Sequence, residues 1–234
     1  MIPLMTKQQH ARFTALKAEM DKKYQKNAQV FIPVGPSKIS DIPARILFIG
    51  QATGGEWSSE SLSDYDKAWD KATNEVAECA PSRTGGFWQV VDDITKNTFR
   101  EIGVQLPAER YCDVIGWSNL AKISKYSGNP NGGALNMQAD LCVEQLQFEI
   151  QTMDPTAIVL LSGEFARKQI LYPVFGEDDW SHDNEERDRV AFKVVHGRPV
   201  LFLNHPRRMG GPGYRKASVD FAVSMIAHHV RSGY

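Results

Sequence analysis

Cysteine is scarce in this chain of 234 residues. The three cysteines are Cys79, Cys112 and Cys142, and no two of them form a CxxC pair. Neither a disulfide framework nor a four-cysteine metal site is therefore indicated. So few cysteines fit a reducing compartment, and we expect a cytoplasmic protein.

Long apolar runs and a large net charge are also missing. No apolar run approaches the roughly 20 residues that a helix needs to span a bilayer. The N-terminal segment carries basic residues where a signal peptide has an apolar core, so we expect no membrane partner. The formal net charge is −1, and any nucleic-acid site must therefore be a local basic patch.

The residues that are present have an ordinary globular composition, with 42% apolar and 24% charged. A chain of this length suits one domain, and two small domains are the less favoured alternative. We expect a single domain over residues 1–234, with an N-terminal helical extension at 1–40 and a core at 44–230.

Apolar runs alternate with helical patterns along the core. Strands are predicted at 45–49, 111–117, 156–161, 190–195 and 199–203, and helices at 6–26, 62–78, 87–102, 136–153, 164–171 and 214–231. The alternation predicts an α/β fold of three layers (α/β/α) with a mainly parallel central sheet.

Two of the predicted strands end in short polar loops. One leads into the glycine-rich segment GQATGGE at 50–56, and the other leads into NHPRR at 204–208. Ligands bind outside the carboxyl ends of strands in open α/β sheets, so we interpret these loops as facing halves of one active site. The first loop is neither a dinucleotide fingerprint nor a P-loop, since position 52 is alanine and no Gly-Lys-Ser/Thr follows. A plain strand-to-helix turn is the alternative.

His205 lies between a strand and a proline that fixes the backbone and aims the imidazole. A structural histidine that caps a turn is the alternative. The residues that follow are basic and surround a glycine-rich tip, which suits a loop that grips phosphates and inserts an apolar wedge between bases. The predicted DNA-binding residues here are Arg207, Arg208, Met209 as the wedge, Tyr214 and Arg215.

Asn119 ends the predicted strand at 111–117. Its carboxamide offers one acceptor and two donors in a plane, which can read one edge of a pyrimidine. An Asx-turn residue is the alternative.

Together these segments resemble the uracil-DNA glycosylase superfamily, in order, over roughly residues 44–230. ILFIGQATGG is similar to the first motif, which takes forms such as GQDPYH, GEAPG or GINPG, and GGFWQVV is similar to the NRFWK segment of the mismatch-specific branch. DVIGWSNLAK resembles the strand that ends in the base-reading asparagine, and VLFLNHPRRM resembles the HPS motif. Residues 141–171 are similar to the long helix, strand and GxxA turn of the iron–sulfur branch.

The resemblance implies a uracil-DNA glycosylase-like fold and a monofunctional DNA glycosylase, which flips a base out of DNA and hydrolyses its N-glycosidic bond to leave an abasic site. By position, His205 would stabilise the leaving base and Asn119 would read its edge. Phe87 or Trp88 would pack near the base, although one alignment places the stacking position nearer Arg83.

The first loop would hold the water, with Gly50, Ala52 and Gly54 lining the substrate pocket. Lys122 would contact a phosphate. The expected partner is DNA, and the protein is expected to act as a monomer.

Departures from the family pattern concern the water and the cofactor. The carboxylate that activates water in the family falls at Gln51 or Ala52, neither of which is a base. Gln51 or Thr53 would orient a water, and Glu56 would serve as base if the loop folds back. The iron–sulfur cysteines are absent, since Ile123 stands at one ligand position and only Cys142 falls near another, so no cofactor is expected.

The bulky residue that excludes a thymine methyl in the family is replaced by small glycines at 54–55. The expected target is therefore uracil-related or a bulkier modified pyrimidine, for which modified cytosine in viral DNA is one source and defence one role. A catalytically silent DNA-binding protein of the same fold is the first alternative. An unrelated α/β nucleotide or nucleoside enzyme is the second.

Overall fold

The structure, a computed structural model, describes most of the chain. The described residues are 1–24, 29–36, 42–52, 64–83, 85–124, 128–178, 180–182, 190–209 and 212–233. The predicted site residues Thr53, Gly54 and Glu56 lie outside them.

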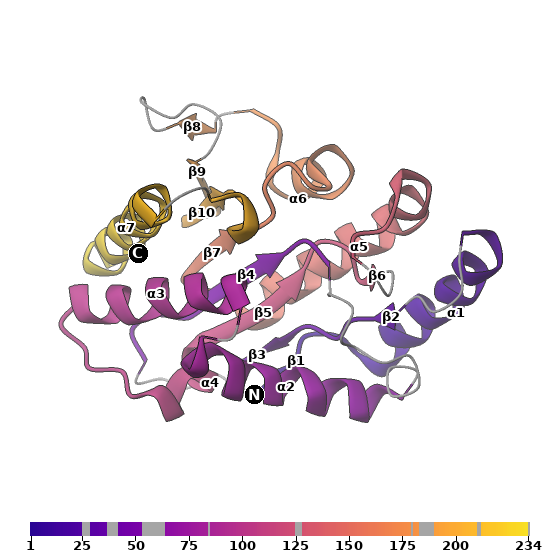
Figure 1. The fold of residues 1–234 in the computed structure, drawn as a ribbon, viewed down its shortest axis with the longest axis horizontal. Coiled ribbons are helices and arrows are strands. Elements are labelled where there is room, and N and C mark those ends of the chain that lie inside the picture. The colour runs from indigo at the N-terminus through magenta and orange to yellow at the C-terminus, as the bar shows by residue number, and fades with distance from the viewer. Residues whose placement is uncertain are drawn as a thin grey trace.

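An eight-stranded sheet forms the middle of the molecule, in the order β1-β3-β5-β4-β7-β10-β9-β8 (Figure 1). The four central strands β5, β4, β7 and β10 run parallel, and the flanking strands pair antiparallel with them. The predicted parallel centre is thus confirmed, while both edges are antiparallel. The strands of this sheet are β1 (Ile2–Pro3), β3 (Val34–Gly35), β4 (Ile46–Gly50), β5 (Ile115–Asn119), β7 (Ala157–Leu160), β8 (Ser181–His182), β9 (Val190–Val195) and β10 (Arg198–Leu203). A separate pair joins β2 (Gln29–Val30) to β6 (Ile123–Ser124).

Helices cover both faces of the sheet (Figure 1). On one side α2 and α7 each contact α3, and all three contact strands of the sheet, while on the other side α1 and α6 contact α5. These three layers match the architecture expected from the sequence. The helices are α1 (Lys7–Lys23), α2 (Tyr65–Ser82), α3 (Gly85–Glu101), α4 (Tyr111–Val114), α5 (Gly132–Met153), α6 (Tyr172–Phe175) and α7 (Pro212–Arg231). Across these described residues, no helix combines the length and the apolar character needed to cross a membrane.

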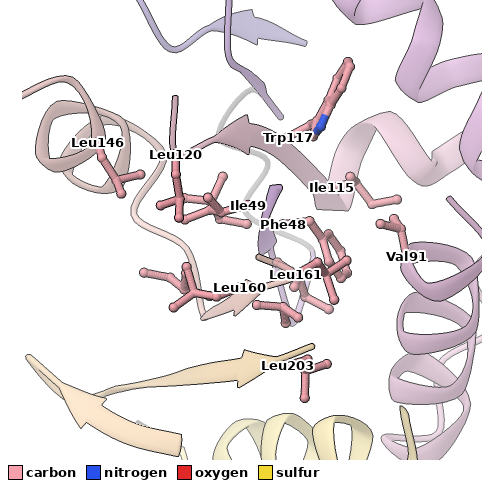
Figure 2. Packing of buried hydrophobic residues seen from close by; sticks show 14 of the residues in the cluster. Phe48, Ile49, Val91, Ile115, Trp117, Leu120, Leu146, Leu160, Leu161 and Leu203 are labelled. Atoms are coloured by element: carbon pink, nitrogen blue, oxygen red, sulfur yellow. The ribbon is translucent and has the colours of Figure 1, made fainter. Parts of the chain in front are cut away.

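The core lies on both faces of the central strands, because both faces are covered. All five residues of β4 and all five of β5 are buried. Figure 2 shows Ile49 on the side of α5, near Leu146, and Phe48 on the side of α3, near Val91. Neighbouring residues of a strand point to opposite faces, so a continuous apolar run such as ILFI serves both layers at once.

Several boundaries differ from the prediction: α5 begins at Gly132 rather than at 136, and the predicted helix at 164–171 is a turn followed by a π-helical segment at Arg167–Leu171. Two further differences concern the elements next to the site. Residues 111–114 form the short helix α4, and the strand begins only at Ile115. Helix α2 continues through Pro81 and ends at Ser82, where Arg83 adopts a left-handed conformation (φ 59°). A short apolar pattern such as 111–117 is compatible with either a buried helix or a buried strand. The tertiary contacts of Tyr111 favour the helix at 111–114.

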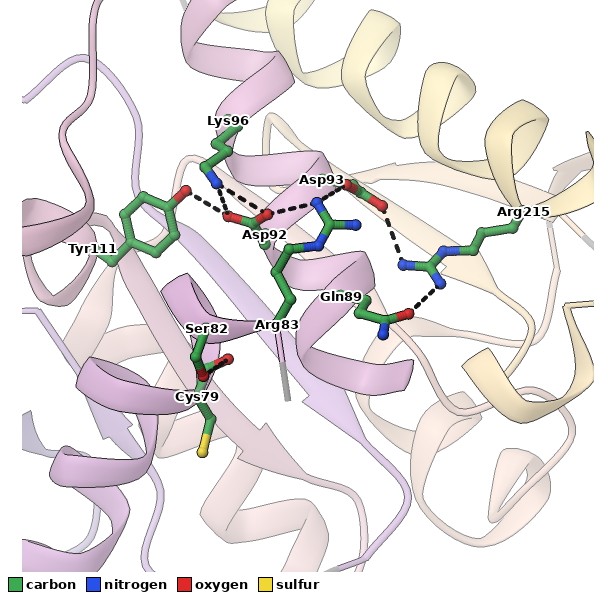
Figure 3. A network of polar contacts seen from close by, with 9 residues as sticks. All are labelled: Cys79, Ser82, Arg83, Gln89, Asp92, Asp93, Lys96, Tyr111 and Arg215. Carbon is green, nitrogen blue, oxygen red and sulfur yellow. Dashed lines mark hydrogen bonds and ion pairs between the residues drawn. The ribbon is translucent and has the colours of Figure 1, made fainter. Parts of the chain in front are cut away.

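A polar network ties these helices together beside the sheet (Figure 3). Asp92 of α3 is fully buried and accepts a hydrogen bond from the Tyr111 hydroxyl at 2.6 Å. Arg83 at the end of α2 donates to both Asp92 (2.9 Å) and Asp93 (2.7 Å). Arg215 of α7 donates to Asp93 at 3.1 Å. Burial, followed by the hydrogen bond to Asp92, raises the pKa of Tyr111, so the phenol stays a donor. The network therefore fixes α3 relative to α2, α4 and α7.

The Asp92 network gives a stability prediction. Asp92→Ala leaves the buried Tyr111 hydroxyl without its acceptor and should lower the free energy of unfolding by about 2 to 3 kcal/mol. Asp113→Ala, which removes a partly exposed pair with Arg110, should cost about 1 kcal/mol or less. Urea unfolding measures both, and equal losses would contradict a special role for Asp92.

Candidate active site at the carboxyl ends of the sheet

A cavity of about 670 Å³ opens where β4 and β5 end. The loop after β4, the end of β5, the first turn of α3 and the segment after β10 form most of its wall. The rest comes from α2 and from the segments at 128–129 and 164–165. The two predicted halves of the site, one at 50–52 and one at His205, therefore lie around one cavity. The residues from the four main parts of the wall are Gly50, Gln51, Ala52, Trp117, Asn119, Gly85, Gly86, Phe87, Trp88, His205, Arg207 and Arg208.

Gly50 and Asn119 are register partners on adjacent parallel strands. A Cβ atom at position 50 would lie 2.5 Å from Asn119 Oδ1, so the carboxamide occupies the space that any other residue would fill. Asn119 is 3% exposed, and within the described part of the chain its Nδ2 has no hydrogen-bond partner. Buried donors are rarely left unsatisfied. A ligand acceptor in the cavity would complete this one.

Gln51 joins three loops at the mouth of the site. Its Nε2 donates to the Ser162 carbonyl at 2.7 Å, and its Oε1 accepts from Asn129 Nδ2 at 2.7 Å. A carboxylate could not make the first bond, because it has no hydrogen to donate to a carbonyl. The amide at position 51 is thus explained by its structural contacts.

His205 is oriented by its own turn. Its Nδ1 accepts a hydrogen bond from the Arg207 backbone N–H at 3.3 Å, which leaves the proton of the neutral ring on Nε2. Burial lowers the pKa of His205, and the positive charges of Arg207 and Arg208 lower it further. The site therefore holds a neutral imidazole that presents an N–H donor.

Aromatic rings line the wall beside Asn119. Phe87 lies edge-on to Trp88 with ring centroids 5.1 Å apart, and Trp88 lies 5.0 Å from Trp117. Phe87 and Trp88 therefore lie at the cavity, as the sequence predicted. Trp117 was not predicted, although it is two residues before Asn119 and so on the same face of β5.

Two predicted DNA contacts are wrong. Lys122 is fully buried, with its ammonium 2.8 Å from Glu149 and donating to Ser118 Oγ and the Asn119 carbonyl, so it cannot reach a phosphate. Met209 is 1% exposed and belongs to the core, so it cannot act as a wedge.

Three other residues were predicted to contact the base or the DNA. Arg83 does not line the cavity, because it is held by Asp92 and Asp93. Arg215 is occupied by contacts to α3, including a bond to Gln89 at 2.6 Å, and is assigned to holding α7 in place. Tyr214 accepts a hydrogen bond from Asn204 at 3.3 Å, and its contact with DNA stays a prediction.

Arg207 and Arg208 remain as the basic patch. Both side chains are exposed and both line the cavity. Neither guanidinium is ion-paired to another described residue.

The chain matches no family model, and a search of curated proteins finds no match to it. The argument for function therefore depends on the cavity itself. Nowhere in the described ranges do three or more His, Cys, Asp or Glu side chains gather in a way that could hold a metal ion.

Two acidic residues of the cavity wall were missed from the sequence. They are Glu75 of α2 and Glu164, which follows β7. The rule that ligands bind at the carboxyl ends of parallel strands could have indicated Glu164. No sequence signal singles out Glu75, because a glutamate on an amphipathic helix is ordinarily a solvated residue.

The His205 environment gives a titration prediction. Followed by NMR, the imidazole should titrate with a midpoint below its ordinary value of 6.5, because burial and two neighbouring cations disfavour the charged form. Arg207→Gln together with Arg208→Gln should raise the midpoint while leaving it below 6.5, since burial is the larger cause. A wild-type midpoint at or above 6.5 would contradict the described environment.

The Lys122–Glu149 pair gives a second prediction. Lys122→Met leaves a buried carboxylate without its counterion and should cost about 3 to 5 kcal/mol of stability at neutral pH. Burial already raises the pKa of Glu149, and Lys122 opposes that rise. Without Lys122 the pKa of Glu149 in the folded state rises further. Because a carboxyl group with a raised folded-state pKa binds its proton more tightly when folded, stability is lost as the pH rises through that pKa.

The loss should therefore shrink as the pH falls and Glu149 takes up a proton. Adding Glu149→Gln to Lys122→Met should recover most of the lost stability. Denaturant unfolding at several pH values measures this, and a loss independent of pH would show that Glu149 is not the cause.

Proposed function

We propose that the protein is a monofunctional DNA glycosylase with a uracil-DNA glycosylase-like fold. The observation that carries the proposal is one cavity in which a buried, unsatisfied amide donor of Asn119 and an N–H donor of a neutral His205 are both present. Hydrogen-bond donors held in place are what a base carrying negative charge needs as it leaves the sugar. The resemblance of the motifs supplies the reaction class.

The proposed target is a pyrimidine-type base flipped out of DNA. Asn119 Nδ2 would donate to a carbonyl oxygen of the base, and the rings of Phe87, Trp88 and Trp117 would pack near it. A cavity of about 670 Å³ falls in the range that holds drug-sized ligands, which is more than an unmodified pyrimidine fills. A bulkier modified pyrimidine, such as a modified cytosine in viral DNA, fits that space, and its removal would serve defence.

His205 would stabilise the leaving base. A neutral imidazole that donates a hydrogen bond can stabilise a developing anion without giving up its proton, and its low pKa keeps it in that state at neutral pH. Lys122 does not form a Schiff base in this proposal, because it is enclosed in an ion pair with Glu149. The reaction is therefore a hydrolysis that leaves an abasic site.

A catalytically silent DNA-binding protein is the second candidate. The engagement of Gln51 with Ser162 and Asn129 favours it, since the usual position of the water activator carries a structural amide. Product analysis separates the two candidates, because only the enzyme generates free bases and abasic sites.

The decisive experiment is a mass-spectrometric screen for free bases released from uracil-containing, mismatched and virally modified DNA. The wild type should release a base from at least one of these. His205→Ala and Asn119→Ala should each lose about 100-fold or more in rate, as removal of one fixed donor does in other enzymes. His228→Ala, an exposed histidine on α7, is the matched control. Release that is unaffected by both site variants would refute the assignment of the cavity.

DNA binding should depend on the exposed arginine pair. Arg207→Glu with Arg208→Glu should weaken binding and reduce the slope of log affinity against log salt by about 2, since about 0.9 counterions are released per phosphate contact. Arg12→Glu, on the exposed side of α1, is the control for a charge reversal away from the cavity. Fluorescence anisotropy at several salt concentrations measures the slope. Binding that is insensitive to salt and unaffected by the pair would instead favour an unrelated nucleotide or nucleoside enzyme.

A further inference from the structure

Hydrolysis at this site needs a carboxylate, and the loop after β4 does not supply one from its described residues. Position 52 is alanine, and Gln51 is an amide whose two ends are bound to Ser162 and Asn129. Cleavage of a glycosidic bond places positive charge on the sugar, and carboxylates stabilise that charge and activate water in enzymes that break such bonds. The following inference rests on the proposed function.

Among the described residues that line the cavity, two carry a carboxylate: Glu75 and Glu164. Both oxygens of Glu164 accept from Arg167 Nη1, at 2.8 and 3.0 Å, and the side chain is 62% exposed. Glu164 is thus bound to a guanidinium at the solvent side. Its exposure makes Glu164 the weaker candidate, because water screens the charge of an exposed carboxylate more than that of a half-buried one.

Glu75 is brought to the cavity by the way α2 packs. The buried face of α2 consists of Ala68, Ala72, Val76 and Ala80, spaced four residues apart. Small residues let a helix lie close to its neighbour, and α2 contacts α3, whose first turn forms part of the cavity wall. Glu75 lies beside Val76, at the margin of this face, and is half-buried. Glu75 therefore lines the cavity from a helix that packs against α3.

We propose that Glu75 is the catalytic carboxylate of this site, in place of the missing residue of the first loop. The C1′–N bond of the flipped nucleotide breaks, and its electron pair passes to the base, which accepts a hydrogen bond from His205 Nε2. A water oxygen forms the new bond to C1′ as Glu75 takes one of its protons. That proton then passes to solvent or to the released base.

The charge distribution of the cavity fits this division of roles. Arg207 and Arg208 are at one part of the wall, where negative phosphates would lie, and His205 is beside them. Glu75 comes from a different element, α2, and adds negative charge to the same cavity. A sugar that becomes positive between a departing base and an attacking water is stabilised by a carboxylate of this kind.

Single-turnover base release from the substrate found in the screen tests the proposal. Glu75→Gln should lower the rate by about 100- to 10,000-fold, the contribution typical of a general base. Binding to a duplex that carries a tetrahydrofuran abasic site should stay the same or become tighter, because a negative charge has been removed near the phosphates. Glu101→Gln, an exposed glutamate at the C-terminal end of α3, is the matched control and should keep the rate within a few-fold of the wild type. Glu164→Gln and Glu56→Gln test the two other candidate carboxylates.

Two further measurements separate catalysis from folding. The wild-type rate should fall on the acid side as the carboxylate is protonated, and this acid limb should be absent from the residual rate of Glu75→Gln. Added formate should restore part of the rate to Glu75→Ala, which a merely misfolded variant would not show. Thermal unfolding of each variant provides the check on folding.

The outcomes distinguish the inference from the function on which it rests. If the wild type releases no base from any DNA tested, the proposed function is wrong and the inference falls with it. If the wild type releases a base and Glu75→Gln does so equally fast, only the inference is overturned. Loss of rate in Glu56→Gln with retention in Glu75→Gln would assign the base to the first loop instead.

Discussion

The candidate site depends on one close approach between two parallel strands. Gly50 and Asn119 end β4 and β5 in register, and the missing side chain of the glycine gives the carboxamide the space it occupies. The register continues past the strand ends, where the Gly50 carbonyl accepts from the Leu120 N–H at 2.9 Å. A slip of one residue would turn Asn119 to the other face of the sheet. The position of the amide donor is therefore set by backbone pairing.

Polar contacts behind and around Asn119 hold this arrangement in place. The buried ammonium of Lys122 donates to the Asn119 carbonyl and is neutralised by Glu149 on α5. Gln51 fixes the neighbouring loop. The network around Asp92 holds α3, which supplies the aromatic wall. The polar residues that surround the cavity thus serve mainly to restrict motion, and few of them are available to a ligand.

The general fold and the two halves of the site were predictable from the sequence, because continuous apolar runs ending in polar loops mark buried parallel strands. Whether an individual long side chain is buried or exposed was not predictable. Lys122 and Met209 follow predicted strand ends exactly as phosphate-binding and wedge residues would, yet both are buried. Their direction is decided by partners distant in sequence, such as Glu149. The position of Glu75 was not predictable for the same reason, since the cavity it borders is formed by elements that lie both before and after α2 in the chain.

The burial of Met209 changes what the adjacent arginines can do. Arg207 and Arg208 form a short 3₁₀ turn between the pinned ring of His205 and a methionine enclosed in the core. The backbone that carries the two guanidinium groups is consequently anchored at both ends. The two side chains can still change rotamer, but the backbone that positions them has little entropy left to lose on binding. On the proposed function, DNA would bend or unstack to meet a backbone fixed in this way, and the energy of that deformation depends on the DNA sequence.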